Sequence, residues 1–379
     1  MKDKYKESIK LHKKYGGKLE VNSKVQLKNR KDLSLAYTPG VAGVCIEIAK
    51  DPKLAKLYTI KKNTVAIVSD GSAILGLGNL GALAAIPVME GKAAIFKEFG
   101  GVDAFPICIN TQDTEEIIKL VKNIAPVFGG INLEDIAAPR CFEIEERLRR
   151  ELDIPVMHDD QWGAATVTLA ALINALKLRK SKPADIRVVL SGVGAAGVAT
   201  GRLLHEYGIT NTLFCDSKGV INNKRKDLNK EKIELLSRSS IQGFTGTFED
   251  AITGSDVFIG LSKPNLLSPT MVKSMNEDPI IFALANPNPE ILPEVAHKAG
   301  AFIVATGRSD YPNQINNSLV FPGAFRAMLD KKIPQFNNKI FVKIAISLAK
   351  VVERPTRENI IPSMFDKKVF KSVYKSVTN

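Results

Sequence analysis

The chain has 379 residues, more than one hydrophobic core usually serves, so its length predicts two domains. Its composition, with 45% hydrophobic and 25% charged residues, is ordinary for a soluble globular protein and excludes a disordered or collagen-like chain. The net charge of +13 is concentrated at one end: residues 1–31 hold 11 Lys and Arg against three acids (+8), so the other 348 residues carry only +5. No stacking aromatics or recognition motif accompany this basic segment, and we therefore expect no nucleic-acid partner.

The cysteines and the apolar runs bear on the compartment. The four cysteines are scattered and form no C-x-x-C pair, so the sequence predicts neither a disulfide framework nor a zinc site. All four lie in apolar segments, where a free thiol is expected to pack as a small core side chain: Cys45, Cys108, Cys141 and Cys215. The N-terminus lacks an apolar signal region, and the longest apolar run, 80–89, is too short to cross a bilayer. We expect a cytoplasmic protein with no membrane partner.

In chain order, the predicted elements alternate between helices and strands. A short helix over 3–15 is followed by helical stretches near 42–49 and 52–58. Short apolar runs then predict strands at Thr64–Ser69, Ala104–Ile109, Ala125–Phe128 and Pro155–His158. Helical patterns lie between them at about 79–96, 113–123 and 139–151. This alternation predicts parallel sheets built from crossover units.

A break in the pattern separates two series of elements. A long helix from about Ala164 to Leu178 ends at Lys180–Pro183, and the second series begins at Ile186–Leu190. The pattern thus predicts an α/β fold with two parallel-sheet domains divided near this break. With the long helix counted as part of the second domain, the N-terminal domain covers residues 1–160 and the second covers 161–379. The chain beyond residue 331 is basic and partly helical, and we expect it to dock on a domain surface or a partner subunit.

A glycine-rich loop opens the second domain. The β-branched strand Ile186–Leu190 leads directly into Gly192-Val-Gly-Ala-Ala-Gly197, and a helix follows. Gly192 permits a tight turn, Gly194 lets the backbone approach a pyrophosphate, and Gly197 allows close packing of helix on strand. The backbone at Ala195, Ala196 and the helix start would offer N–H groups to the phosphates. The sequence therefore predicts a Rossmann-type domain that binds a nicotinamide dinucleotide and supports hydride transfer.

An acid follows where a ribose-binding carboxylate is expected. Asp216 ends the predicted strand Thr212–Asp216 and lies 19 residues beyond Gly197 (216 − 197). A carboxylate there favours NAD, because it repels the 2′-phosphate of NADP. Lys218 comes two residues later and could offset that repulsion, so the sequence leaves the choice between NAD and NADP open. A strand-end Asp without any ligand is the alternative.

Two acidic pairs follow neighbouring strands of the first domain. Glu134-Asp135 comes after one predicted strand and its Gly-Gly turn, and Asp159-Asp160 comes after the next strand. The carboxyl ends of parallel strands meet at one edge, so the four carboxylates should converge in one crevice. Such a group repels itself without a cation, and oxygen ligands select a hard ion such as Mg²⁺ or Mn²⁺. The alternative, of equal weight, is that Asp135 and Asp160 are helix N-caps.

Four further side chains are candidates for proton transfer or ligand binding. Tyr37 precedes a Pro-Gly turn and could donate a proton, although a packing role is the default. Lys92 has small neighbours in an apolar stretch, so we expect burial to lower its pKa towards that of a base; extension to solvent is the alternative. Asn286 and Asn317 offer uncharged amides that suit the carboxamide of nicotinamide or a substrate carboxylate.

Taken together, these segments resemble the malic enzymes, specifically the short bacterial type, from about Leu33 to Met328. The motifs that carry the resemblance are Tyr37-Thr-Pro-Gly-Val41, Val68-Ser-Asp-Gly71, Leu75-Gly-Leu-Gly-Asn79, Glu90-Gly-Lys92, Leu133-Glu-Asp135, His158-Asp-Asp-Gln161, Gly192–Gly197, Ala285-Asn-Pro287 and Asn316–Gly323. The resemblance implies oxidative decarboxylation of L-malate to pyruvate and CO₂ with NAD or NADP and Mg²⁺ or Mn²⁺. It also implies that residues 1–160 form the substrate and metal domain, and that the protein is a homodimer.

The resemblance further implies a role for each candidate. Glu134, Asp135 and Asp160 would be the metal ligands. Lys92 would be the general base and Tyr37 the general acid, with Asp159 near Lys92. Asn286 and Asn317 would contact the substrate or the nicotinamide. In a dimer, Tyr37 can serve the site of the neighbouring subunit.

The sequence departs from the family pattern at two places. The family often has His-Asp-Asp-Gln-His-Gly-Thr, whereas here Trp162 follows Gln161 and Ala164 follows Gly163. Ser72-Ala73 stand where the larger animal and plant enzymes carry an arginine that grips the substrate, so the cationic partner of the malate carboxylate is unidentified.

Two other functions compete with this interpretation. A metal-independent, two-domain dehydrogenase of the amino-acid class would also combine a lysine with a Rossmann domain. A non-enzymatic dinucleotide sensor would need only the glycine loop, and would leave Tyr37, Lys92 and the acids without a purpose.

Overall fold

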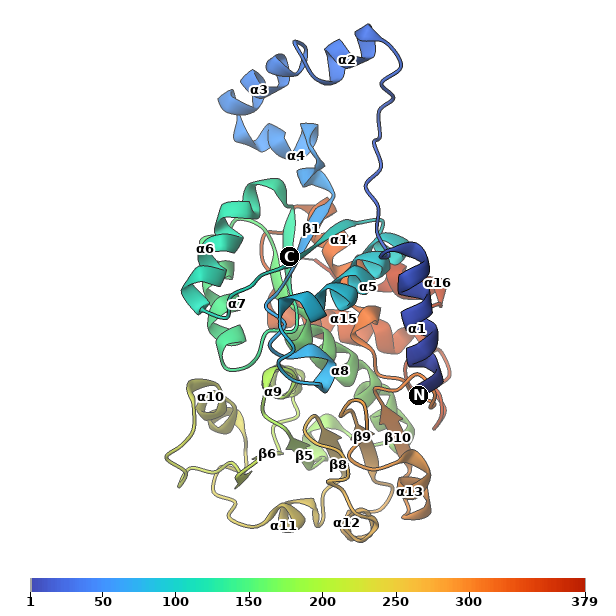
Figure 1. The fold of residues 1–379 in the computed structure, drawn as a ribbon. Coiled ribbons are helices and arrows are strands. Elements are labelled where there is room, and N and C mark those ends of the chain that lie inside the picture. Colours follow the sequence, from blue (N-terminus) through green and yellow to red (C-terminus); the bar gives the residue numbers. More distant parts are fainter. Residues whose placement is uncertain (1, 379) are drawn as a thin grey trace.

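The computed structural model describes residues 2–378, which form two α/β domains and a projecting N-terminal segment (Figure 1). The first domain is built on a parallel sheet in the order β2-β1-β3-β4. Its strands are β1 (Thr64–Ser69), β2 (Asp103–Cys108), β3 (Gly130–Leu133) and β4 (Val156–His158). The helices between them are α5 (Ala82–Gly100), α6 (Thr114–Ile124) and α7 (Arg140–Glu151). The strand order reverses between β1 and β3, so the loops after these strands diverge and open a crevice at their carboxyl ends.

The second domain follows the long helix α8 (Asp159–Arg179). Its sheet has the order β10-β9-β8-β5-β6-β7, with every neighbouring pair parallel except β6 and β7. The strands are β5 (Val188–Ser191), β6 (Thr212–Asp216), β7 (Gly219–Val220), β8 (Val257–Gly260), β9 (Ile280–Ala283) and β10 (Ile303–Thr306). The helices are α9 (Ala195–Tyr207), α10 (Lys230–Arg238), α11 (Phe248–Ile252), α12 (Pro269–Ser274) and α13 (Pro293–Lys298). Here the order reverses between β5 and β8, directly beside the glycine loop.

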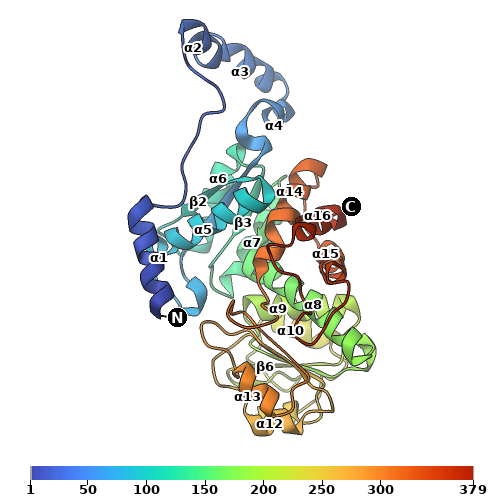
Figure 2. The same cartoon turned by 90° about the vertical axis from the view of Figure 1, so that its right-hand side faces the viewer.

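The last three helices return to the first domain (Figure 2). They are α14 (Phe321–Lys331), α15 (Asn338–Val351) and α16 (Lys367–Ser376). Helix α14 packs on α5, where Phe321 and Phe325 lie 4.7 and 5.5 Å from Phe96 between ring centroids. Helix α15 packs on α8, so the basic C-terminal segment docks on a domain surface, as expected. Helix α8 runs across the predicted boundary between residues 160 and 161, which stays a prediction.

The N-terminal segment begins on the body and then leaves it. Helix α1 (Lys2–Tyr15) lies beside α5, where Lys18 donates from its backbone N to Glu90 and from its side chain to the carbonyl of Pro87. Residues 19–60, which we call the arm, carry α2 (Arg30–Ala36), α3 (Val41–Lys50) and α4 (Ala55–Tyr58). No residue of the arm is buried, and both views show it standing clear of the two domains (Figures 1 and 2).

The predicted α/β class is confirmed, although the second sheet is mixed because β7 runs antiparallel to β6, and two local expectations are wrong. Residues Ala125–Val127 form a 3₁₀ turn, and the strand lies at Gly130–Leu133 instead. A proline cannot donate to a strand ladder, and Gly130 can enter the sheet because its bare Cα faces the ring of Phe325. The long helix begins at Asp159, five residues before the predicted Ala164.

The expectation for the cysteines holds in part. Cys141 and Cys215 are buried, as core side chains, but Cys45 is exposed because it lies on α3, of which no residue is buried. Among the described residues, no helix combines the length and the apolar character needed to span a membrane.

Candidate active site

Lys92 lies at the centre of the predicted site. It projects from α5 and is 7% exposed. Its Nζ lies 2.5 Å from Glu134 Oε2, directly after β3, and 2.5 Å from Asp159 Oδ2, at the start of α8. The same Nζ lies 4.4 Å from the ring centroid of Phe321. The structure thus brings a lysine from one helix and acids from two strand ends together in the crevice of the first sheet.

Asp135 and Asp160 complete what we call the acidic cluster: Glu134, Asp135, Asp159 and Asp160. The backbone N–H of Asp135 donates to Asp160 Oδ2 at 2.8 Å, which ties the two strand ends together. Asp135 is 3% exposed, and its Oδ2 is buried without a hydrogen-bond partner. Asp160 is more open, with His158 Nε2 3.4 Å from its Oδ2.

The alternative interpretation, that these acids are helix N-caps, is wrong. The N-cap of α8 is His158, so Asp160 already lies within the first turn. The N-cap of α7 is Pro139, four residues beyond Asp135. Neither carboxylate is therefore occupied in closing the helix that follows it.

The cluster carries more negative charge than Lys92 can balance. Burial, reinforced by the neighbouring carboxylates, raises the pKa of Glu134 well above its usual range despite the attraction of Lys92. Burial and the charge of Asp160 raise the pKa of Asp135 to about 7. Burial also raises the pKa of Asp159. Ionised carboxylates held this close favour a bound cation.

The pKa of Lys92 corrects one expectation. Burial does lower it, as the small neighbours suggested, but the charges of Asp159 and Glu134 raise it by more. The net pKa of Lys92 lies above its ordinary value, so the expected lowering is wrong for this arrangement. The sequence showed the burial but could not show that two carboxylates would contact the ammonium.

The donor set of the cluster fits a divalent ion. Oxygen ligands are those that Mg²⁺ and Mn²⁺ prefer, and the unpartnered Oδ2 of Asp135 is available to one. Within residues 2–378, however, no three His, Cys, Asp or Glu side chains already point at a common centre as a metal site requires. The acidic cluster therefore fits a divalent ion by the type of its ligands and by their nearness to one another.

The glycine loop has the geometry that the sequence predicts. Gly192 has φ +98°, and a Cβ there would lie 2.3 Å from the carbonyl oxygen of Leu261. A Cβ on Gly197 would lie 1.8 Å from the carbonyl oxygen of Gly192. Gly194 is the N-cap of α9 and faces open space, with no side chain capping the helix. Ala195 and Ala196 form the first turn, so their N–H groups are open to an anion.

Asp216 is held by cations that the sequence analysis missed. Arg225 approaches both of its oxygens, at 2.8 and 3.0 Å, and Lys232 Nζ lies 2.7 Å from Oδ2. Although burial works against ionisation, these two side chains lower the pKa of Asp216 to about 2. The side chain of Lys218, which we expected to offset the charge, instead pairs with Asp227 at 2.9 Å.

The two asparagines lie where the domains meet. A Cβ on Gly163, in the second turn of α8, would come within 2.9 Å of Asn317 Cβ and 2.1 Å of Asp159 Oδ1, so Asn317 neighbours the acidic cluster. A Cβ on Gly76, in the loop after β1, would lie 2.4 Å from the carbonyl oxygen of Asn286. The structure thus brings the side chain of Asn317 against the start of α8 and the main chain of Asn286 against the loop after β1, whereas the side-chain amide of Asn286 lies beside Gly307.

Tyr37 is the one candidate that its own chain does not bring to the site. It is the C-cap residue of α2 on the arm, and its side chain is 69% exposed. Lys92, in contrast, is enclosed in the body of the first domain. Figure 1 shows α2 at the tip of the arm, far from α5.

Arg140 is a further cation that the sequence analysis did not single out. It lies in the first turn of α7, pairs with Asp70 at 3.0 Å and donates to Ser72 Oγ at 3.1 Å. A guanidinium thus lies beside Ser72, where the sequence analysis left a cationic partner for a substrate carboxylate unidentified. Its place could not be read from spacing, because Arg140 is 68 residues away along the chain.

Comparisons with family models, curated sequences and solved structures all identify the same protein family. Residues 16–149 match the malic enzyme N-terminal domain, and residues 162–373 match the malic enzyme NAD binding domain. The NAD-dependent malic enzyme of Geobacillus stearothermophilus is 54% identical over 96% of this chain and 76% of its own. The bifunctional malic/malolactic enzyme of Bacillus subtilis is 52% identical over 98% and 91%. The crystal structure of the NAD-dependent malic enzyme from Thermotoga maritima superimposes with a TM-score of 0.94 at 47% identity, covering 97% of this chain and 98% of that one.

Proposed function

The chain belongs to the malic enzyme family, and from that membership we propose that Lys92 and the acidic cluster convert malate to pyruvate and CO₂ while NAD(P)⁺ is reduced. The observation that carries this proposal is the enclosure of Lys92 between Glu134 and Asp159, beside Asn317 of the NAD-binding domain. An amino-acid-type dehydrogenase would not need the acidic cluster, and a dinucleotide sensor would need neither the acids nor Lys92.

Lys92 is the proposed general base. In its neutral form, Nζ would take the proton of the C2 hydroxyl as hydride leaves C2 for the nicotinamide. Asp159 fixes the direction of Nζ through its 2.5 Å contact, and the ring of Phe321 limits access of water from one side. The C4 carboxylate of the resulting 2-keto acid, which is β to the new carbonyl, then leaves as CO₂, and the electron pair of the broken C3–C4 bond forms an enolate.

Glu134, Asp135 and Asp160 are the residues that would hold Mg²⁺ or Mn²⁺. This assignment is supported by the buried Oδ2 of Asp135, which has no hydrogen-bond partner, and by the raised pKa of both Glu134 and Asp135. When bound, the divalent ion polarises the substrate carbonyl and neutralises the charge that develops as CO₂ leaves. Glu134, once engaged by a cation, would attract the ammonium of Lys92 less, and the pKa of Lys92 would fall towards that of a base.

Tyr37 is the proposed acid that protonates C3, and we place it in the site of a second subunit. The support is the arm: 13 of the 26 large hydrophobic side chains that the described residues expose lie within residues 19–60. A second apolar run is exposed at the start of α5 and in the loop before it, at Leu75, Leu77, Leu80, Leu83 and Ile86. Apolar surface on this scale is typical of an interface, and a homodimer would cover the arm and bring Tyr37 to a neighbouring Lys92.

We propose that the NAD-binding domain accepts NADP⁺ as well as NAD⁺. The support is the neutralisation of Asp216 by Arg225 and Lys232, since these cations offset the repulsion that a lone carboxylate exerts on a 2′-phosphate. Displacement of Asp216 from Arg225 would present a planar guanidinium to that phosphate.

Steady-state kinetics with L-malate test the function directly. With Mn²⁺ present we expect malate-dependent reduction of both NAD⁺ and NADP⁺, with one CO₂ released per dinucleotide reduced. EDTA should abolish the rate, and added Mn²⁺ should restore it. Turnover that persists in EDTA would contradict the metal-dependent mechanism and favour a metal-independent dehydrogenase.

A further inference from the structure

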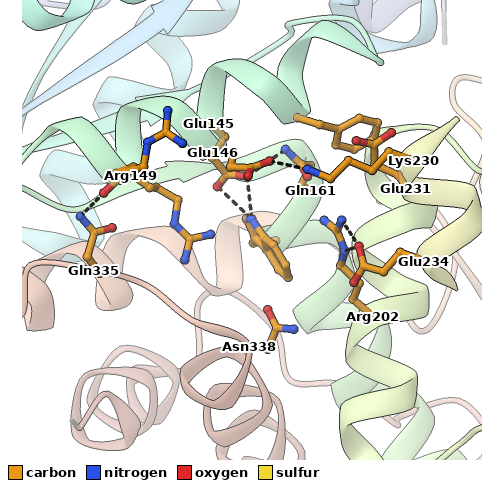
Figure 3. Close-up of a pocket in the computed structure, with 13 residues that line it drawn as sticks. Glu145, Glu146, Arg149, Gln161, Arg202, Lys230, Glu231, Glu234, Gln335 and Asn338 are labelled. Atoms are coloured by element: carbon orange, nitrogen blue, oxygen red, sulfur yellow. Dashed lines mark hydrogen bonds and ion pairs between the residues drawn. The ribbon is translucent and has the colours of Figure 1, made fainter. Parts of the chain in front are cut away.

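Glu145 is a buried carboxylate that forms no ion pair with any cation of the described residues. It lies on α7 and is 4% exposed. Burial of an ionised group is costly unless hydrogen bonds replace its water. Three N–H groups do so here: the backbone of His158 and the side chains of Gln161 and Trp162. Figure 3 shows Gln161 beside Glu145.

All three donors belong to the junction between β4 and α8. His158 donates from its backbone N to Oε1 at 3.0 Å, and Gln161 donates from Nε2 to Oε2 at 3.0 Å. Trp162 donates from Nε1 to both oxygens, at 2.8 and 3.0 Å. His158 is the N-cap of α8 but has no side-chain cap of its own. Glu145 therefore takes up the N-cap backbone N–H and fixes two side chains of the first turn.

The same turn carries half of the acidic cluster. Asp159 and Asp160 lie between His158 and Gln161, so any shift of this turn moves both carboxylates. Asp159 contacts Lys92 Nζ and Asp160 accepts from the backbone of Asp135, contacts that a shift of this turn would break. Among the described residues, no hydrogen bond or ion pair joins Glu145 to Lys92 or to a member of the acidic cluster.

Trp162 connects this junction to Lys92 by a second route. Its indole stacks on Phe341 of α15, with centroids 4.9 Å apart and planes within 2°. From Phe341 a continuous series of ring contacts leads through Phe336, Phe325 and Phe96 to Phe321, the ring beneath Lys92. The only tryptophan in the chain is thus both a donor to Glu145 and the first ring of this series.

We propose that Glu145 is a positioning residue, whose carboxylate holds the first turn of α8 and thereby sets Asp159 for Lys92 and Asp160 for the divalent ion. The inference rests on the proposed metal-dependent function. Residues behind the ligands of a metal site commonly orient those ligands, and their loss lowers metal affinity or activity by about 10–100-fold. Trp162 serves the same junction as the third donor.

Glu145→Gln is the central test, with Glu146→Gln as its matched control. The amide retains the shape of Glu145 but turns an N–H group towards donors that need an acceptor. Glu146 is the next residue of α7, is exposed and pairs only with surface Lys230. We expect Glu145→Gln to weaken Mn²⁺ binding, measured by electron paramagnetic resonance, and to lower kcat, each by about 10–100-fold. The KM for the dinucleotide should stay within about twofold, since a Cβ on Gly192 or Gly197 would meet Leu261 or Gly192 rather than this turn, and Gly194 faces open space.

A second variant protects the test against misfolding. Glu145 lines a pocket of about 560 Å³ between α7, α8, α9, α10 and the start of α15, so Glu145→Ala leaves a space that solutes can reach. Formate should then replace the carboxylate and restore Mn²⁺ binding and turnover in a saturable manner. Chloride at equal ionic strength should not, and formate should not activate the wild-type enzyme. Trp162→Phe, which keeps the ring and loses the N–H, should weaken Mn²⁺ binding by less than Glu145→Gln.

The outcomes separate positioning from mere stability. A Glu145→Gln enzyme that melts earlier but binds Mn²⁺ as the wild type does would overturn the proposal, and so would a Glu145→Ala enzyme that formate does not restore. Wild-type enzyme that turns over malate with Mn²⁺ would leave the proposed function standing in either case. Wild-type enzyme that binds no Mn²⁺ would overturn both.

Discussion

The pKa of Lys92 results from two opposing effects, and substitution of this one residue tests its role. Burial alone lowers its pKa, whereas the 2.5 Å contacts with Glu134 and Asp159 raise it. Removal of one partner from a buried ion pair leaves the other charges uncompensated and costs about 3–5 kcal/mol. The lysine is therefore as important to the stability of the crevice as to the proposed chemistry.

Lys92→Met should abolish turnover without abolishing dinucleotide binding. We expect kcat to fall at least about 10²–10⁴-fold, the range typical of a lost general base, while the Kd for NAD⁺ by fluorescence titration changes little. Thermal unfolding should show a destabilised first domain. Lys97→Met is the control, because Lys97 lies on the same helix but pairs with Asp103 at the surface, where an ion pair contributes about 0–1 kcal/mol. Turnover that survives in Lys92→Met would rule out the lysine as base.

Sequence reasoning at this scale found the residues but not their electrostatics. The spacing of Glu134-Asp135 and Asp159-Asp160 after successive strands predicts convergence, and the structure brings the four acids together around Lys92. The spacing does not predict which carboxylate contacts the ammonium of Lys92, because that depends on side-chain direction and on the depth of the crevice. Glu145 gave no signal at all: a glutamate within a helix rich in charges is ordinarily a surface residue.

At the scale of elements, motifs with a specific steric requirement predicted the structure better than the strand propensity of short apolar runs. The glycine loop was predicted with its strand and helix because each glycine answers a specific steric need, and the close contacts at Gly192 and Gly197 bear this out. The strand at Gly130–Leu133 was missed because glycine disfavours strands and the apolar run before it resembles one. Its place is decided by Phe325 of the C-terminal helix α14, a contact that no local window contains.

The end of β6 and the start of α10 together decide the proposed cofactor choice. Arg225 and Lys232 come from the segment after β7 and from α10, and both converge on Asp216. Arg225→Gln should raise the KM for NADP⁺ by about 10-fold or more, because a charge-assisted hydrogen bond contributes about 1.5–3 kcal/mol. The KM for NAD⁺ should change by less than about threefold, since Asp216 remains available to the ribose hydroxyls.

Lys218→Ala provides the matched control for this element. Lys218 lies nearer to Asp216 in sequence, but its side chain is exposed and pairs with Asp227. We expect both KM values to stay at the wild-type level in this variant. An Arg225→Gln enzyme that loses affinity for NAD⁺ and NADP⁺ equally would mean that the arginine only shapes the loop.

At the scale of the whole molecule, the arm is the feature that one chain cannot account for. A segment of 42 residues (19–60) without a single fully buried side chain gains little from hydrophobic burial in the monomer. The same segment holds Tyr37, whose proposed partner Lys92 lies deep in the body of the chain. Sequence alone indicated two of the three helices of the arm, near 42–49 and 52–58, and missed α2. Their separation from the body was not predicted, because the surface that we propose to cover them belongs to a second copy of the chain.

Complementation between two inactive variants distinguishes a shared site from a self-contained one. Lys92→Met and Tyr37→Phe are each expected to have little activity as homodimers. In a mixed dimer, one site would combine both defects, whereas the other would combine an intact Lys92 with an intact Tyr37 from its neighbour. Random pairing of equal amounts makes half of the dimers mixed, with one active site of two, so we expect about a quarter of the wild-type rate. Within a self-contained site every active centre would carry one defect, and mixing would recover nothing. Co-expression with two affinity tags, followed by assay of the doubly tagged fraction, measures this directly, and that fraction should turn over malate at about half the wild-type rate.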